Sequence, residues 1–167
     1  QAIGIHRDGG LADYVIVPQK QAFPLPTSLD PAFGAFCEPL ACCIHGTDVA
    51  QIQPGSTVLV LGGGVIGLLT VQLAKLAGAN VMLATRNKAK RDLALRLGAT
   101  AVIDPAATDI TAEIQSLSHG GADVVMECAG VPETVEQAPK LARPGGRVVI
   151  VGVLAQGLKV QYEPFDL

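Results

Sequence analysis

A glycine-rich turn between two apolar segments is the part of this sequence best suited to hold a phosphate group. Gly62, Gly64 and Gly67 follow the spacing G-x-G-x-x-G, and Val65 and Ile66 complete the motif. Glycines at these positions allow a tight turn, let the backbone approach a pyrophosphate and let the following helix pack closely on the preceding strand. Unpaired N–H groups and the positive end of the helix dipole would then face the anion.

The segments on either side of this turn support its interpretation as a binding motif. The β-branched run 58–61 predicts a fully buried strand, and Leu68 to Leu76 predicts a helix. A glycine turn that binds nothing is the alternative interpretation in a chain with 19 glycines. A strand, a glycine turn and a helix in this order instead indicate a dinucleotide-binding unit.

The end of the next predicted strand, 80–84, bears on which dinucleotide is bound. Thr85 and Arg86 stand there, and no acidic residue occurs between positions 80 and 91. An Asp or Glu about 20 residues past the glycines would bond the adenosine ribose and repel a 2′-phosphate. A hydroxyl and a guanidinium group suit that phosphate instead. Three further basic residues follow: Lys88, Lys90 and Arg91.

This basic segment predicts NADP as the cofactor, with NAD as the alternative. The other interpretation of the cations is a solvated start of a helix. Positive charge is mildly unfavourable at a helix N-terminus, which favours a phosphate partner.

The remaining chain alternates between strand and helix patterns. Strands are predicted at 101–103, 123–127 and 147–151, and helices at 87–97, 111–118 and 132–142. This order predicts an α/β fold with a parallel, doubly wound sheet. A six-stranded version of the fold would still need one more strand after residue 167.

Two strand-end turns rich in small residues follow the fourth and fifth predicted strands. Their residues are Cys128, Ala129 and Gly130, and Val151, Gly152 and Val153. Ligands of open α/β sheets bind at this carboxyl edge. Small residues at strand ends also arise for packing reasons alone.

Residues 1–36 do not read as the start of the same domain. Gly9 to Pro18 predicts a turn and a strand, and a mixed helical stretch runs from Asp30 to about Val49. An early strand needs partners that the later chain does not supply. We therefore predict a partial segment of another domain at 1–36 and a dinucleotide-binding domain at 37–167.

Composition excludes several classes of function. The 167 residues are 49% hydrophobic and 16% charged, with a net charge of −3, so nucleic acid and anionic membranes are not expected partners. Glycines and polar residues interrupt the apolar zone 58–83, which argues against a membrane span. Four cysteines without a C-x-x-C pair indicate no disulfide framework or zinc knuckle, and a cytoplasmic location is the default.

Several segments together resemble the medium-chain dehydrogenase/reductase superfamily, and within it the zinc-dependent alcohol and polyol (sorbitol dehydrogenase-like) group. The matching segments are GGLADYVIVP (9–18), CEPLACCIHG (37–46), VLVLGGGVIGLLTVQLAKLAGA (58–79), DVVMECAG (123–130) and GGRVVIVGV (145–153). The resemblance implies a Rossmann domain that lacks its last strand, together with a remnant of the catalytic domain.

The resemblance also implies roles for individual residues. Glu38 of the E-P-L motif matches the glutamate at or near the catalytic zinc, where a mobile carboxylate eases exchange of water for substrate. A glutamate favoured by the helix dipole is the alternative. The turn 128–130 would touch the cofactor riboses, and the turn 151–153 would give backbone groups to the nicotinamide carboxamide. Thr85 and Arg86 resemble the NADP-preferring members.

The resemblance implies hydride transfer between the nicotinamide and a small alcohol, polyol or ketone in a homo-oligomeric enzyme. Its other zinc ligands would precede Gln1, so we expect no stable zinc and little turnover from this chain alone. Cys37, Cys42 and Cys43 are interpreted as core residues rather than ligands. The rivals are a zinc-free quinone or enone reductase of the same superfamily, which a metal assay would distinguish, and a non-catalytic nucleotide-binding module.

Overall fold

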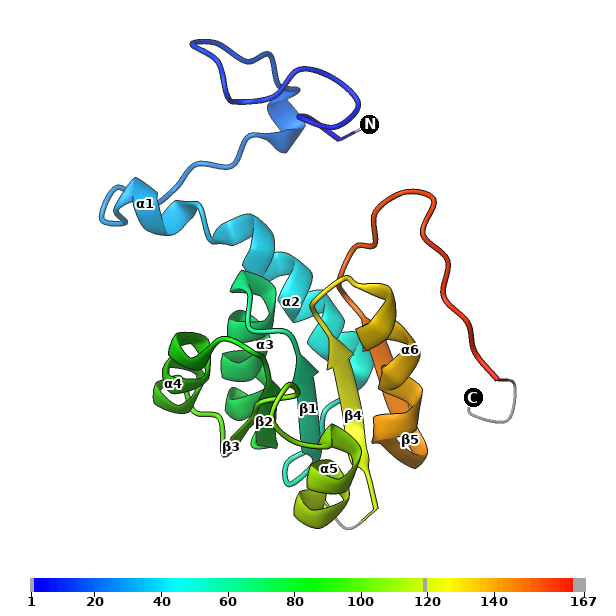
Figure 1. Cartoon of the computed structure of the whole chain (residues 1–167). Coiled ribbons are helices and arrows are strands. Elements are labelled where there is room, and N and C mark those ends of the chain that lie inside the picture. Colours follow the sequence, from blue (N-terminus) through cyan, green and yellow to red (C-terminus); the bar gives the residue numbers. More distant parts are fainter. Residues whose placement is uncertain (1, 119, 164–167) are drawn as a thin grey trace. The chain divides into compact units, whose positions relative to one another are not determined.

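The computed structural model of the chain (Figure 1) describes residues 2–118 and 120–163. The chain divides into two compact units, Gln1–Phe36 and Cys37–Leu167. Nearly all regular secondary structure belongs to the second unit, which holds both buried clusters of apolar side chains.

The first unit contains only short elements. These are a 3₁₀ turn, η1 (Gln19–Gln21), and the four-residue helix α1 (Pro31–Gly34), where the Asp30 carboxylate accepts a 2.8 Å hydrogen bond from the N–H of Ala32. The strand predicted within Gly9 to Pro18 is wrong, because these residues pair with no strand of the described chain. A strand needs a neighbour for its N–H and C=O groups, and the described part of this unit supplies none.

The second unit is built on a five-stranded parallel sheet. The strands are β1 (Thr57–Leu61), β2 (Asn80–Ala84), β3 (Ala101–Ile103), β4 (Ala122–Glu127) and β5 (Ala142–Ile150). Their order in the sheet is β3-β2-β1-β4-β5. The chain thus winds outward from β1 in one direction and then returns to build the other half, which confirms the predicted doubly wound α/β fold.

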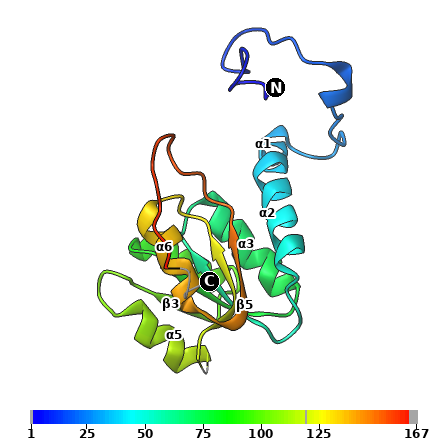
Figure 2. The ribbon, with the colours of Figure 1, turned by 90° about the vertical axis from the view of Figure 1, so that its right-hand side faces the viewer.

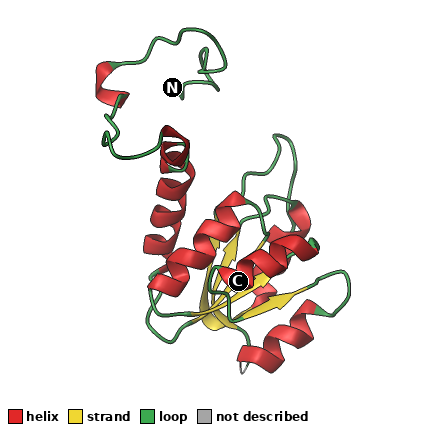
Figure 3. Cartoon of the chain, turned by 90° about the vertical axis from the view of Figure 1, so that its left-hand side faces the viewer, coloured by secondary structure: helices red, strands yellow, loops and turns green. Residues whose placement is uncertain are grey.

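Helices cover both faces of this sheet (Figures 2 and 3). One face is covered by α2 (Cys37–Ala50), α3 (Val65–Leu76) and α4 (Lys88–Arg96), and the other by α5 (Ile110–Ser118) and α6 (Pro132–Leu141). The helix predicted from Asp30 is broken at Ala35 and Phe36 into α1 and α2.

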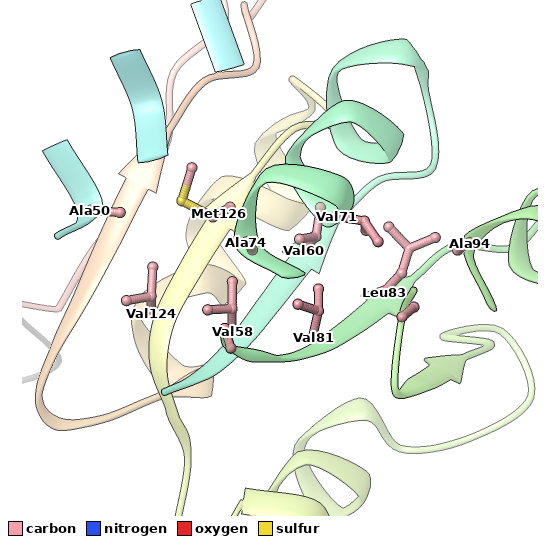
Figure 4. Close-up of a cluster of buried hydrophobic side chains, with 12 residues drawn as sticks. Ala50, Val58, Val60, Val71, Ala74, Val81, Leu83, Ala94, Val124 and Met126 are labelled. Carbon is pink, nitrogen blue, oxygen red and sulfur yellow. The ribbon is translucent and has the colours of Figure 1, made fainter. Parts of the chain in front are cut away.

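The apolar strands divide their side chains between the two faces because successive residues point in opposite directions. Val58 and Val60 pack beneath α3 and α2 (Figure 4), whereas Leu59 and Leu61 pack toward α5 and α6. All four are at most 2% exposed, so the run carries no polar alternation. This two-sided burial explains why the strand reads as a continuous hydrophobic segment.

The register brings the carboxyl ends of all five strands into one row. Leu61 pairs with both Ala84 and Glu127. Ala84 also pairs with Ile103, and Glu127 pairs with Ile150. The segments that leave these strands therefore start side by side at one edge of the sheet.

At the opposite edge, Asp123 ties β4 to the start of β1 and to β5. Its Oδ2 accepts a 2.7 Å hydrogen bond from the N–H of Thr57, and its Oδ1 accepts a 2.6 Å bond from Nε of Arg143. The pairing around it is irregular, with a register shift between Ala122 and Val124, and β5 begins at Ala142 rather than at the predicted residue 147. The Thr57 N–H and the Arg143 guanidinium hold the pKa of the Asp123 carboxyl below its usual value.

We expect the substitution Asp123→Asn to lower the free energy of unfolding at pH 7 by about 1 to 2 kcal/mol, because charge-assisted hydrogen bonds are replaced by neutral ones at a partly exposed site. The folded-state pKa is depressed, so this stabilisation is complete above the unfolded pKa of about 3.9 and is lost as the pH falls through the lower folded value. Urea unfolding at pH 7 and pH 3 measures the difference, with the exposed Asp48→Asn as control. A difference that stays constant between these pH values would contradict the assignment.

Candidate functional site: the carboxyl edge of the sheet

The glycine turn joins β1 to α3 with no room for side chains at two of its positions. Gly62 has a φ of +105°, and a Cβ there would lie 2.9 Å from the Ala129 nitrogen. A Cβ on Gly67 would overlap the carbonyl oxygen of Gly62. By contrast, a Cβ on Gly64 would have no atom within 4 Å, and Gly64 caps α3 without a side-chain hydrogen bond. The N-terminus of α3 thus faces open space, as a pyrophosphate requires.

The predicted cofactor residues meet along the edge in the order of the strands. A Cβ on Gly63 would lie 3.0 to 3.1 Å from side-chain atoms of Thr85 at the end of β2. Gly62 packs on Ala129 at the end of β4, and a Cβ on Gly130 would lie 2.8 Å from the carbonyl oxygen of Val153 after β5. Four strand ends therefore form one continuous surface of small residues and backbone.

The basic residues after β2 are of two kinds, those without a protein partner in the described chain and those paired with an aspartate. Arg86 and Lys90 are exposed, and their side chains have no recorded partner among the described residues. Lys88, in contrast, pairs with Asp92 at 2.8 Å within α4. The backbone N–H of Lys90 is used by the N-cap, donating to the Asn87 side chain at 3.1 Å.

Arg91 is held in place by protein groups. Its Nη1 donates to the carbonyl oxygen of Thr85 at 2.7 Å, and its Nη2 pairs with Asp104 at 2.9 Å. The prediction that the whole basic segment offers positive charge to a phosphate is therefore corrected at Lys88 and Arg91, because each of these side chains pairs with an aspartate. Arg91 instead fixes the end of β2, from which Thr85 and Arg86 project.

The backbone of the turns after β4 and β5 is largely occupied. The N–H groups of Cys128, Ala129 and Gly130 donate to Leu61 and to the Glu127 side chain, and those of Val151 and Gly152 donate to the Glu127 carbonyl oxygen. Among these two turns, only the Val153 N–H and the carbonyl oxygens lack a recorded hydrogen bond within the described chain. Backbone groups offered to a ligand would thus be mainly acceptors.

Cys128 carries a neutral thiol at a partly buried position. Burial raises its pKa to about 12, and its sulfur lies 3.9 Å from the hydroxyl of the buried Thr70 on α3. A thiol with this pKa is not a nucleophile near neutral pH. Its side chain packs α3 against the end of β4.

Glu38 lies in the first turn of α2 and is exposed. The Cys42 thiol donates to its Oε1 at 3.6 Å. Of the cysteines predicted to be in the core, only Cys43 is buried, whereas Cys37 and Cys42 are exposed. Among residues 2–118 and 120–163, no group of three or more His, Cys, Asp and Glu side chains could hold a metal ion. The described residues of this chain therefore do not form a zinc site by themselves.

Sequence reasoning missed the side chains that support the site from behind. Glu127 is fully buried and accepts hydrogen bonds from Ala129, Gly130 and Thr134, and Asp104 holds Arg91. An acidic residue directly after the apolar run VVM, as in DVVMECAG, was the signal for Glu127. No local signal marks the Arg91–Asp104 pair, because it joins residues from α4 and the end of β3.

In the part of the chain that the structure describes, no helix has both the length and the apolarity that crossing a bilayer demands.

The chain matches a known protein family. Residues 65–167 match the family model described as zinc-binding dehydrogenase. Galactitol 1-phosphate 5-dehydrogenase of Escherichia coli K12 is 35% identical over 167 residues, covering 98% of this chain and 48% of that protein. Sorbitol dehydrogenase of Halalkalibacterium halodurans is 36% identical over 159 residues, covering 93% of this chain and 46% of that protein.

Two solved structures share the fold over nearly the whole chain. A zinc-binding dehydrogenase of Sinorhizobium meliloti 1021 bound to NADP has a TM-score of 0.91 and 62% identity, covering 99% of this chain and 50% of that chain. An alcohol dehydrogenase of Escherichia coli CFT073 complexed with NADH has a TM-score of 0.89 and 27% identity, covering 99% of this chain and 49% of that chain. The chain thus spans about half the length of the relatives it matches. It belongs to the zinc-binding dehydrogenase family of the medium-chain dehydrogenase/reductase superfamily.

Proposed function

We propose that this chain is the cofactor-binding part of a zinc-dependent alcohol or polyol dehydrogenase and that it binds NADP(H) in preference to NAD(H). The observation that carries the cofactor preference is the end of β2, where Thr85 and Arg86 occupy the place of a ribose-binding acid. The partner substrate would be a small alcohol, polyol or ketone that exchanges a hydride with the nicotinamide.

The charges after β2 support a bound 2′-phosphate. Arg86 and Lys90 are exposed cations whose side chains have no recorded protein partner in the described chain, whereas Arg91 is neutralised by Asp104. A guanidinium group free of protein acceptors can present its fork of N–H donors to a phosphate dianion. The solved relative from Sinorhizobium meliloti, which is 62% identical, is itself bound to NADP.

The glycine turn supports the position of the pyrophosphate. The open space at Gly64 and the uncapped N-terminus of α3 form a cradle for an anion. In this arrangement Val65 and Ile66 would contribute the first backbone N–H groups of α3, and the turns 128–130 and 151–153 would line the path of the rest of the dinucleotide. NADP, when bound, supplies the hydride acceptor, and the chain supplies its binding and orientation.

Glu38 is the residue through which this chain would take part at the zinc. Its place in the Glu38-Pro39-Leu40 motif and its exposure at the start of α2 support that role in the presence of further ligands. The same motif argues against a zinc-free quinone or enone reductase.

The substitution Arg86→Ala should weaken NADPH binding by roughly 10- to 100-fold, because charge-assisted hydrogen bonds of about 1.5 to 3 kcal/mol are lost. NADH binding should change by less than about twofold, since NADH lacks the 2′-phosphate. Fluorescence titration of the chain with each nucleotide measures both affinities. Arg96→Ala, at an exposed position in the last turn of α4, is the matched control and should leave both affinities unchanged.

Tighter binding of NADH than of NADPH by the unmodified chain would overturn the preference. Unchanged NADPH affinity in the Arg86→Ala variant would show that the phosphate is bound elsewhere.

The substitution Gly64→Ala tests the pyrophosphate cradle. Its methyl group would have no protein atom within 4 Å, so the unfolding temperature should be unchanged. The same methyl would occupy the space of the pyrophosphate, so affinity for NADPH and NADH should both fall about tenfold or more, equivalent to about 1.4 kcal/mol. Gly10→Ala, which also has no atom within 4 Å, is the control. Full nucleotide affinity in Gly64→Ala would exclude a phosphate at this turn.

A further inference from the structure

Glu127, the last residue of β4, is fully buried, which is rare for a glutamate. Its Oε1 accepts three hydrogen bonds: from the N–H of Ala129 at 2.8 Å, from the N–H of Gly130 at 3.0 Å and from the Thr134 hydroxyl at 2.7 Å. The carboxylate thereby fixes the turn after β4 and joins it to the first turns of α6.

The backbone of the same residue fixes the neighbouring turn. Its carbonyl oxygen accepts hydrogen bonds from the N–H of Val151 at 2.8 Å and of Gly152 at 2.9 Å. Four backbone N–H groups, two from each strand-end turn, are therefore directed at Glu127. No other described residue accepts hydrogen bonds from both turns.

The second carboxylate oxygen, Oε2, is buried without a hydrogen-bond partner in the described chain. A Cβ on Gly152 would come within 2.5 Å of it, so this oxygen lies against the turn after β5. A buried acceptor without a donor is unfavourable, and an apolar side chain of similar size would avoid it. Core stability alone therefore does not explain a carboxylate here, whereas its hydrogen bonds from the turn after β4 and from Thr134 do.

The topology indicates which half of a dinucleotide these turns face. The pyrophosphate cradle follows the central strand β1, and Arg86 follows β2 on one side of it. A dinucleotide that lies across the switch point with its adenosine ribose over the end of β2 must extend its other half over β4 and β5. The turns held by Glu127 lie on that side.

We propose that Glu127 is a positioning residue for the nicotinamide half of the cofactor, acting through the turns 128–130 and 151–153 without touching the cofactor. This inference rests on the proposed function of the chain. Loss of the carboxylate would release the turn 128–130, on which the turn 151–153 packs at Gly130 and Val153. It would thereby weaken binding of the nicotinamide half while the adenosine half stays in place.

Two nucleotides separate these halves. NADPH carries both, whereas adenosine 2′,5′-bisphosphate carries only the adenosine half with its 2′-phosphate. In Glu127→Ala we expect affinity for NADPH to fall about tenfold or more, with affinity for the bisphosphate unchanged within about twofold. Glu127→Gln retains an acceptor oxygen and should recover part of the NADPH affinity. Calorimetric titration of the full chain measures each value.

Thr134→Val keeps the test decisive if Glu127→Ala does not fold. It removes one donor to Oε1 at a partly exposed position, and we expect a smaller loss, about threefold, for NADPH alone. Equal loss of affinity for both nucleotides in Glu127→Gln and Thr134→Val would mean that Glu127 stabilises the whole fold. Unchanged affinity for both would mean that Glu127 does not position the cofactor. Either result overturns the proposal.

A wrong prediction of NADP preference would give a different result from a wrong prediction for Glu127. In that case the unmodified chain would not bind the bisphosphate, or Arg86→Ala would not weaken it. The comparison of Glu127 variants would then be made with NADH and AMP, which differ in the same nicotinamide half.

Discussion

The close approach of α3 to the turn before it is the constraint on which the rest of the structure depends. Gly67 lies against the carbonyl oxygen of Gly62, and no side chain fits between them. This contact places the N-terminus of α3 directly over the end of β1. It also lets the neighbouring turns pack on the same row, with Gly63 on Thr85 and Gly62 on Ala129. The edge is one continuous surface because its glycines let the neighbouring turns come into direct contact.

Charged side chains behind and beside that surface act in different ways. The side chains of Arg91 and Glu127 are bound by other groups of the protein. Arg91 bridges Thr85 and Asp104, and Glu127 accepts hydrogen bonds from the N–H groups of the turn after β4. Arg86 remains exposed and, within the described chain, unpartnered. The proposed roles follow from this difference. Arg91 and Glu127 hold the two ends of the site in shape, and Arg86 is available to bind a phosphate.

The sequence predicted the second unit well because its signals are local. The apolar run 58–61, the glycine spacing after it and the alternation of periods were enough to identify the doubly wound sheet. The strand within Gly9 to Pro18 failed because β structure depends on a partner that local propensity does not reveal. The contacts of Arg91 were missed for a related reason: its guanidinium group joins α4 to the segments after β2 and β3, and spacing along one element does not encode such contacts. Glu127 was not singled out, although its acidic side chain directly follows an apolar run.

The most direct test of the account is the crystal structure of this chain with NADP bound. We predict that the 2′-phosphate lies within hydrogen-bond distance, about 2.7 to 2.9 Å, of the Arg86 guanidinium group, with the pyrophosphate at the N-terminus of α3 and the nicotinamide half over the turns after β4 and β5. A 2′-phosphate remote from Arg86, or a dinucleotide that runs in the opposite direction across β1, would contradict the account.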